Sequence, residues 1–127
     1  MEQASVEAAN LIKELSSLVQ RLAERDIVVS SFRCDWGSVS VWSLVAQHGA
    51  ATDKYLEALR GPNPLLATGP DLLRCGWDNR DNLLTVERSP ARTLSSPNFW
   101  KLDISRACYS NNEAMGWAEK FMAERLS

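Results

Sequence analysis

The residues best suited to chemistry are the one histidine, His48, and the three cysteines, Cys34, Cys75 and Cys108. An imidazole beside a thiol can generate a nucleophilic thiolate, and both residue types are zinc ligands. Their spacing supports neither use, because the sequence has no Cys-x-x-Cys pair, no His-Glu-x-x-His helix and no glycine-rich phosphate loop. Free cysteines are more often small apolar residues of a core. We therefore expect no catalytic residue, no metal ligand and no cofactor.

A second group of reactive side chains lies at the tip of a predicted β-hairpin. Asp78, Arg80 and Asp81 fall in a polar stretch between two short apolar runs, 72–77 and 83–87. Loops held by flanking strands often carry recognition. Turn formation alone also explains this composition, because aspartate and asparagine side chains hydrogen-bond to their own backbone. Both interpretations stay open, although two carboxylates on one loop do not fix the separation that acid–base catalysis needs.

Tryptophan is abundant, with 5 residues in a chain of 127. Periodicity places Trp100 on an alternating strand face and Trp117 on a helical stripe, and hence both in the core. Trp36 and Trp77 lie instead where hairpins turn. An indole in such a place either caps the core or projects as a binding anchor.

Hydrophobic periodicity predicts the elements that position these residues. Apolar residues spaced by three and four indicate helices, and alternation indicates strands. The predicted helices cover 5–25, 52–60 and 110–126, and the predicted strands cover 27–35, 39–45, 72–77, 83–87 and 100–104. Residues 42–50 fit either the end of a strand or the start of a helix. The last helix is the clearest, because Ser110-Asn111-Asn112-Glu113 matches a capping box.

The order of elements, α-β-β-α-β-β-β-α, groups the strands as hairpins. Such grouping favours antiparallel pairing over the alternating helix and strand of a parallel sheet. We therefore predict one α+β domain over residues 1–127. Its largely antiparallel sheet has about five strands, and the N- and C-terminal helices pack on it.

Composition excludes several classes of function. With 14 basic and 16 acidic side chains the formal net charge is −2, which argues against a nucleic-acid binder. No apolar run approaches the roughly 20 residues of a membrane span, and acidic residues occupy the start in place of a cationic leader. Three widely spaced cysteines suit a reducing compartment. We expect a cytoplasmic protein that binds neither nucleic acid nor membrane.

Binding to another protein is the leading hypothesis. Besides the hairpin tip, a long loop of residues 88–97 carries arginines suited to the polar rim of an interface. The sequence thus favours a non-catalytic protein-binding module, of the bacterial immunity or inhibitor type, that blocks a partner's functional surface. Its predicted contact residues are Trp77, Asp78, Arg80, Asp81, Arg88 and Arg92.

Two alternatives remain open. One is a small enzyme or ligand-binding domain whose pocket is assembled from His48, Tyr55 and a cysteine, either Cys34 or Cys75. The other is a homo-oligomer in which an edge strand or the N-terminal helix meets its own copy.

Overall fold

The computed structural model describes residues 2–36, 40–90, 93–96 and 99–126. Its elements follow the predicted order and confirm the α+β class. The elements are α1 Glu2–Ala23, β1 Ile27–Trp36, β2 Ser40–His48, α2 Gly49–Leu59, the 3-10 segment η1 Pro64–Leu66, β3 Leu72–Asp78, β4 Leu83–Ser89, β5 Lys101–Ala107 and α3 Asn111–Leu126. The ambiguous stretch 42–50 is a strand as far as His48, and α2 follows at once. The hairpin turn predicted to follow Trp36 and the side chain of Trp36 itself lie outside the described residues.

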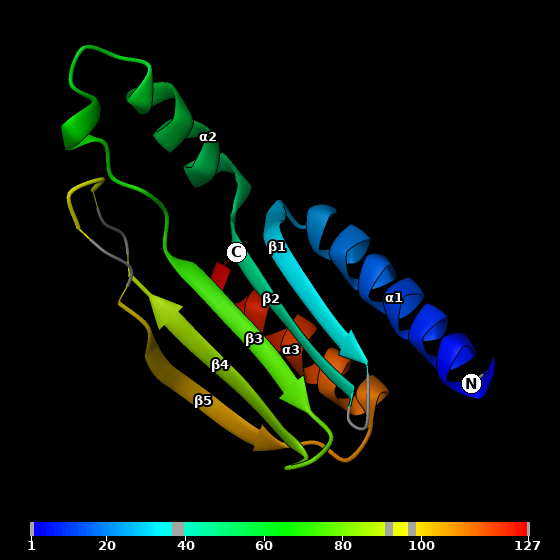
Figure 1. Ribbon diagram of the computed structural model, residues 1–127. Coiled ribbons are helices and arrows are strands. Elements are labelled where there is room, and N and C mark those ends of the chain that lie inside the picture. Colours follow the sequence, from blue (N-terminus) through cyan, green and yellow to red (C-terminus); the bar gives the residue numbers. More distant parts are fainter. Residues whose placement is uncertain (1, 37–39, 91–92, 97–98, 127) are drawn as a thin grey trace.

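The five strands form one antiparallel sheet in sequential order, β1-β2-β3-β4-β5 (Figure 1). β3 is therefore central, and β1 and β5 are the edges. The register sets Trp42 opposite Trp77 and Leu44 opposite Cys75. Paired residues point to the same side of a sheet, so these four side chains share one face.

That face, the inner face, is covered by α1 and α3. α1 lies against β1, and α3 lies across β2, β3 and β4 (Figure 1). α1 contributes Leu11, Leu15, Leu18 and Leu22, whose spacing of three and four aligns them on one side of a helix. From the strands the buried core residues are Ile27, Trp42, Leu44, Ala46, Leu73, Cys75, Trp77, Leu84 and Val86.

Polar contacts fix α3 on the inner face. The Trp42 indole Nε1 donates to Asn111 Oδ1 at 2.7 Å, and Asn111 Nδ2 donates to the Glu14 carboxylate of α1. At the start of α3, Glu113 N donates to Ser110 Oγ at 3.2 Å, as the predicted capping box requires. The Glu113 carboxylate accepts from Tyr109 N, one residue before the serine. The serine therefore satisfies one free N–H of the first turn, and the glutamate bonds the residue before the cap in place of the Ser110 N–H of an ideal capping box.

The opposite, outer face is covered by no helix in the described part of the chain (Figure 1). Its central side chains are half-buried by their neighbours on adjacent strands. Within the described residues, none of the helices combines the length and apolar character that a membrane crossing requires.

α2 lies beyond the end of the sheet, where β2 finishes, and it stands apart from α1 and α3 (Figure 1). Its base is held by the turn after α1, in which Asp26 adopts a φ of 59°. Gly49 N donates to Asp26 O at 2.7 Å, and Ala50 N donates to Asp26 Oδ2 at 3.1 Å. Gly49 is the buried residue of α2.

Candidate functional site

His48 serves as the N-cap of α2. Its Nδ1 accepts from Ala51 N at 3.3 Å. Nε2 lies 3.5 Å from Asp26 Oδ2, and the His48 carbonyl accepts from Thr52 Oγ1 at 2.7 Å. Helix capping therefore explains both the imidazole and its neighbours.

The three cysteine thiols are not activated as nucleophiles, because the pKa of each is raised. Burial raises the pKa of Cys75 to about 12. Burial also raises the pKa of Cys108, and it raises that of Cys34 together with the nearby charge of Asp35. A raised pKa disfavours the thiolate that nucleophilic or ligand chemistry requires.

The structure does not bring His48 and the cysteines together. Cys75 pairs with Leu44 and Cys34 pairs with Trp42, four and six residues from His48 along β2. Those steps separate the backbones by about 13 and 20 Å at the rise of a β-strand. No group of three or more histidine, cysteine or acidic residues suited to a metal occurs within the described ranges. The geometry therefore gives the alternative of a His48–cysteine pocket no support.

Trp77 does not project from the hairpin. It is 4% exposed, and its Nε1 donates to the Cys108 carbonyl at 2.9 Å. The expectation that this indole is free to anchor a partner is wrong, because period-two alternation on β3 directs it to the inner face with Leu73 and Cys75. It closes the tip end of the core instead.

The hairpin tip itself is shaped by turn chemistry. Asp78 Oδ1 accepts from Arg80 N at 2.7 Å, a side-chain-to-backbone bond that confirms the turn interpretation for Asp78. Asn82 has a φ of 51°, which asparagine tolerates, and its carbonyl accepts from Cys108 N. Arg80 and Asp81 are exposed. Their side chains are thus accessible to a partner.

The predicted arginine rim is separate from this tip. Arg88 is at the other end of β4, five residues from Leu83 and hence about 17 Å along the strand. Its guanidinium forms an ion pair with Asp71. Arg92 lies outside the described residues. The six predicted contact residues therefore do not form one patch.

What the structure does bring to the tip is a hollow on the outer face, which we call the Gly76 hollow. It has a volume of about 220 Å³ and is lined by Val41, Trp42, Ser43, Gly76, Trp77, Asp78, Asp81, Leu83 and Thr85. The register explains its shape. One row across β2, β3 and β4 reads Ser43, Gly76, Thr85, and the next row towards the tip reads Val41, Asp78, Leu83. A floor of small residues therefore lies beside a taller wall.

The backbone at Gly76 does not require a glycine. No glycine in the described part of the chain has a positive φ. A Cβ built on Gly76 would lie 3.5 Å from Ser43 Cβ and 3.5 Å from the Trp42 carbonyl oxygen, which is ordinary van der Waals contact. Glycine inside a central strand weakens it, and it often marks a place where another molecule approaches closely. The depth of the hollow thus depends on this one missing side chain.

The hollow is acidic on its tip side. Asp78 and Asp81 both line it, and among the described residues neither carboxylate has an ion-pair partner. The next cation on the outer face of β3, Arg74, is held by Glu87 at 3.0 Å. The Gly76 hollow therefore offers two carboxylates beside the apolar side chains of Val41 and Leu83.

Arg74 also corrects the prediction for Trp100. Its guanidinium lies 4.3 Å from the centre of the Trp100 ring. Since Arg74 alternates with buried Leu73 and Cys75, this stacking puts the indole on the outer face, where it is half-buried, rather than in the core. Trp117 does pack against the core from α3, as predicted, with the Arg106 guanidinium 3.5 Å from its ring centre.

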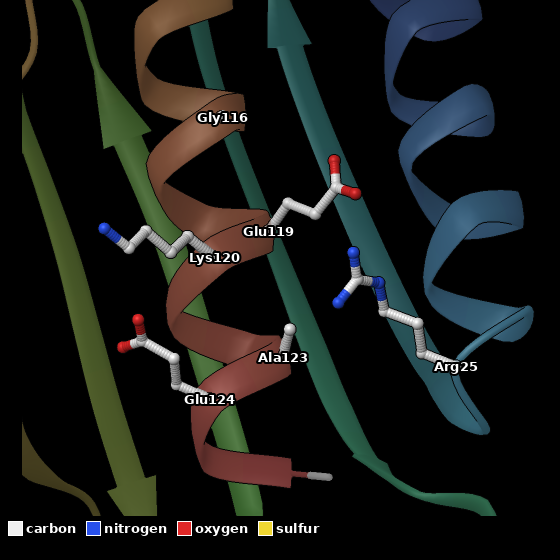
Figure 2. Close-up of a pocket in the computed structure, with 6 residues that line it drawn as sticks. All are labelled: Arg25, Gly116, Glu119, Lys120, Ala123 and Glu124. Atoms are coloured by element: carbon white, nitrogen blue, oxygen red, sulfur yellow. The ribbon is translucent and has the colours of Figure 1, made fainter.

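A larger hollow, of about 470 Å³, lies over α3 beside the end of α1. Figure 2 shows that its lining side chains straddle the helix, with Lys120 and Glu124 on one side and Glu119, near Arg25, on the other. Glu119 is already paired with Arg21 at 3.0 Å. Long charged side chains of both signs that diverge from one another do not define a ligand, so the Gly76 hollow is the better candidate.

The sequence indicated only some of the residues that line the Gly76 hollow. Asp78 and Asp81 were predicted as contact residues. A glycine inside the apolar run 72–77 is a recognised signal of a bulge or of close approach. Val41 and Leu83 gave no signal, because only the register places them beside Gly76.

Comparisons with protein families, with curated proteins and with solved structures found no match to this chain. Its function must therefore be inferred from its own residues.

Proposed function

We propose that this chain is a non-catalytic protein-binding domain whose contact site is the Gly76 hollow on the outer face. The single observation that supports this function is the missing side chain at Gly76, in the central strand, beside two carboxylates that form no ion pair with any residue the structure describes. Glycine at such a position destabilises a strand by roughly 0.5–1 kcal/mol relative to alanine. A role in admitting another molecule accounts for that destabilisation.

The lining indicates the chemistry of the partner. A lysine or arginine side chain has an apolar stem and a cationic end. Its stem would lie over Gly76, between Val41 and Leu83, and its charged end would reach Asp78 and Asp81. Charge-assisted hydrogen bonds to carboxylates are about twice as strong as neutral ones. We therefore propose a protein partner that inserts a basic side chain flanked by apolar residues.

This proposal revises the predicted site. Asp78 and Asp81 stay within it, and Arg80 lies next to it at the tip. Trp77 contributes from beneath, as a buried residue, and Arg88 belongs to a different end of the sheet. Blocking a partner's functional surface, as an immunity or inhibitor protein does, stays a prediction of the sequence.

A peptide library tests the site without knowledge of the partner. Displayed on phage and selected on the purified chain, it should yield peptides in which lysine or arginine is flanked by apolar residues. Fluorescence anisotropy then measures their affinity for variants. Gly76→Val fills the hollow with a side chain suited to a strand, and we expect at least a roughly tenfold loss of affinity.

Matched variants separate filling from general damage. Ser31→Val adds the same side chain on the outer face of β1, opposite Val45 and outside the hollow, and should leave the affinity unchanged. Asp78→Asn keeps the side-chain oxygen that accepts from Arg80 N but removes the negative charge. The double variant with Asp81→Asn should therefore bind the peptides more weakly, and salt should affect its affinity less. Peptides that bind Gly76→Val as tightly as the wild type would refute the placement.

A further inference from the structure

The floor of the Gly76 hollow carries two hydroxyl groups beside the missing side chain. Ser43 on β2 and Thr85 on β4 pair with Gly76 from either side, and both line the hollow. The Cβ of Ser43 lies 3.5 Å from the place where a Cβ of Gly76 would stand. A group that occupies this place therefore lies between two side chains that bear hydroxyls.

The two hydroxyls have no partner in the chain itself. Neither Ser43 nor Thr85 forms a side-chain hydrogen bond with any residue that the structure describes. In the same part of the chain, every buried side-chain oxygen or nitrogen has a hydrogen-bond partner. The unpartnered oxygens of Ser43 and Thr85 are therefore not sealed inside the protein, and they are accessible from the hollow. A hydroxyl oxygen accepts hydrogen bonds as well as donating one.

The acceptors of the hollow are spread along the central strand. Asp78 is two residues from Gly76 along β3, about 7 Å away at the rise of a β-strand. Its Oδ1 accepts from Arg80 N, and its Oδ2 forms no ion pair with a described residue. Asp81 lines the same side. A cation that enters the hollow thus meets hydroxyls beside Gly76 and carboxylates farther towards the tip.

This spread of acceptors distinguishes the two basic side chains. The ammonium of lysine is compact and strongly hydrated, and its three donors diverge from one atom. It pairs well with the carboxylates but does not span the distance to the hydroxyls. The guanidinium of arginine is planar, carries five donors along its edges and is more weakly hydrated. Its weaker hydration also suits the apolar side chains of Val41 and Leu83, which flank Asp78 in the register.

We propose that the Gly76 hollow selects arginine over lysine and that Ser43 and Thr85 determine this specificity. The inference rests on the proposed function, because it names the basic side chain that the partner inserts. The guanidinium lies flat over Gly76, where the absence of a Cβ lets it approach the backbone closely. One edge donates to Asp78 and Asp81, and the remaining donors reach the hydroxyls.

Two of the cations around the hollow are neutralised by acids of the chain. Arg74, next on the outer face of β3, is held by Glu87 at 3.0 Å. Arg33, on β1, is held by Asp35 at 2.7 Å. Arg80 is exposed at the tip and forms no ion pair within the described ranges, so its charge weakens the attraction for a basic ligand. The two carboxylates still give the hollow its acidic character.

Exchange of the anchor residue in one peptide tests the preference. A peptide selected on the purified chain is synthesised with arginine, lysine or citrulline at the anchor, and fluorescence anisotropy gives the three dissociation constants. We expect arginine to bind roughly tenfold more tightly than lysine. Citrulline keeps the shape of arginine without its charge and should lose most of the affinity. Equal affinities for arginine and lysine would overturn this inference alone, whereas binding that survives Gly76→Val would overturn the proposed function as well.

Removal of the hydroxyls identifies the residues responsible. Ser43→Ala with Thr85→Val should reduce the preference for arginine to roughly threefold or less and leave the affinity of the lysine peptide unchanged. An unchanged lysine affinity also shows that the double variant is folded. Ser105→Ala is the matched control, because Ser105 pairs with Thr85 but does not line the hollow, and it should keep the full preference. A double variant that keeps the full preference would contradict the role of the hydroxyls.

Discussion

Along β3, three consecutive inner-face residues and three outer-face residues alternate, and their environments differ sharply. Leu73, Cys75 and Trp77 are at most 4% exposed beneath α3. Arg74, Gly76 and Asp78 lie on the uncovered side, where a glycine takes the central place. Large side chains pack closely on the inner face, whereas the outer face has a hollow at Gly76. The comparison indicates that the packed core lies on one face, and recognition by the other face is our proposal.

The largest expected effect lies on the inner face. Trp42 is fully buried and bonded to Asn111, so Trp42→Ala should lower the free energy of unfolding by about 3–5 kcal/mol. Val45→Ala, three residues along the same strand but half-buried on the outer face, should lower it by less than about 1.5 kcal/mol. Urea unfolding measures both. Equal losses would contradict the division between the faces.

A pH-dependent effect should also come from the inner face. Burial raises the pKa of Cys75 from 9.0 to about 12, so the folded state favours the neutral thiol. Its contribution to stability is complete below the unfolded pKa and is lost as the pH rises from 9.0 towards about 12. The free energy of unfolding should therefore fall across this range, by at most about 1.4 kcal/mol per pH unit for one thiol.

Cys75→Ala isolates that contribution from other groups that titrate in alkali. The variant should lose less stability than the wild type when urea unfolding is compared at about pH 8 and about pH 10. Parallel losses in the two proteins would show that this thiol is not the cause.

The smallest effect is expected on the outer face and has the opposite sign. Gly76→Ala should raise the free energy of unfolding by roughly 0.5–1 kcal/mol, because its Cβ finds ordinary contacts and the unfolded chain loses freedom. Gly49→Ala is the control. There a Cβ would overlap Asp26 Oδ1, so that variant should be destabilised. A destabilised Gly76→Ala would mean that glycine serves the strand and not the hollow.

Much of the architecture could be predicted from local pattern. The sequence motif before α3 predicts that Ser110 Oγ accepts from Glu113 N, and the structure shows that bond. Alternation at 72–77 predicts β3 almost to the residue. The end of β2 was ambiguous, because Trp42, Val45 and Ala46 fit both periods. The cap formed by His48 and Asp26 resolves it, and that contact joins residues that the sequence separates by 22 positions.

The site was less predictable. Asp78 and Asp81 were predicted from their position at a tip, but Trp77, for which core capping and projection were both open, was included among the contact residues and is buried. Tryptophan beside a turn is consistent with either face until the helices that cover one face are placed. Trp100 was misassigned for the related reason that it precedes β5, where alternation no longer fixes the direction of a side chain.

By itself the sequence determined the kinds and order of elements, because helix and strand periods, caps and turn residues act over a few neighbours. It also determined the acidic tip. The tertiary structure alone decided which sheet face is bare, that Gly76 lies between Ser43 and Thr85, and that α2 stands clear of the core. Those features depend on register and on helix placement, which long-range packing sets and no local window of residues contains.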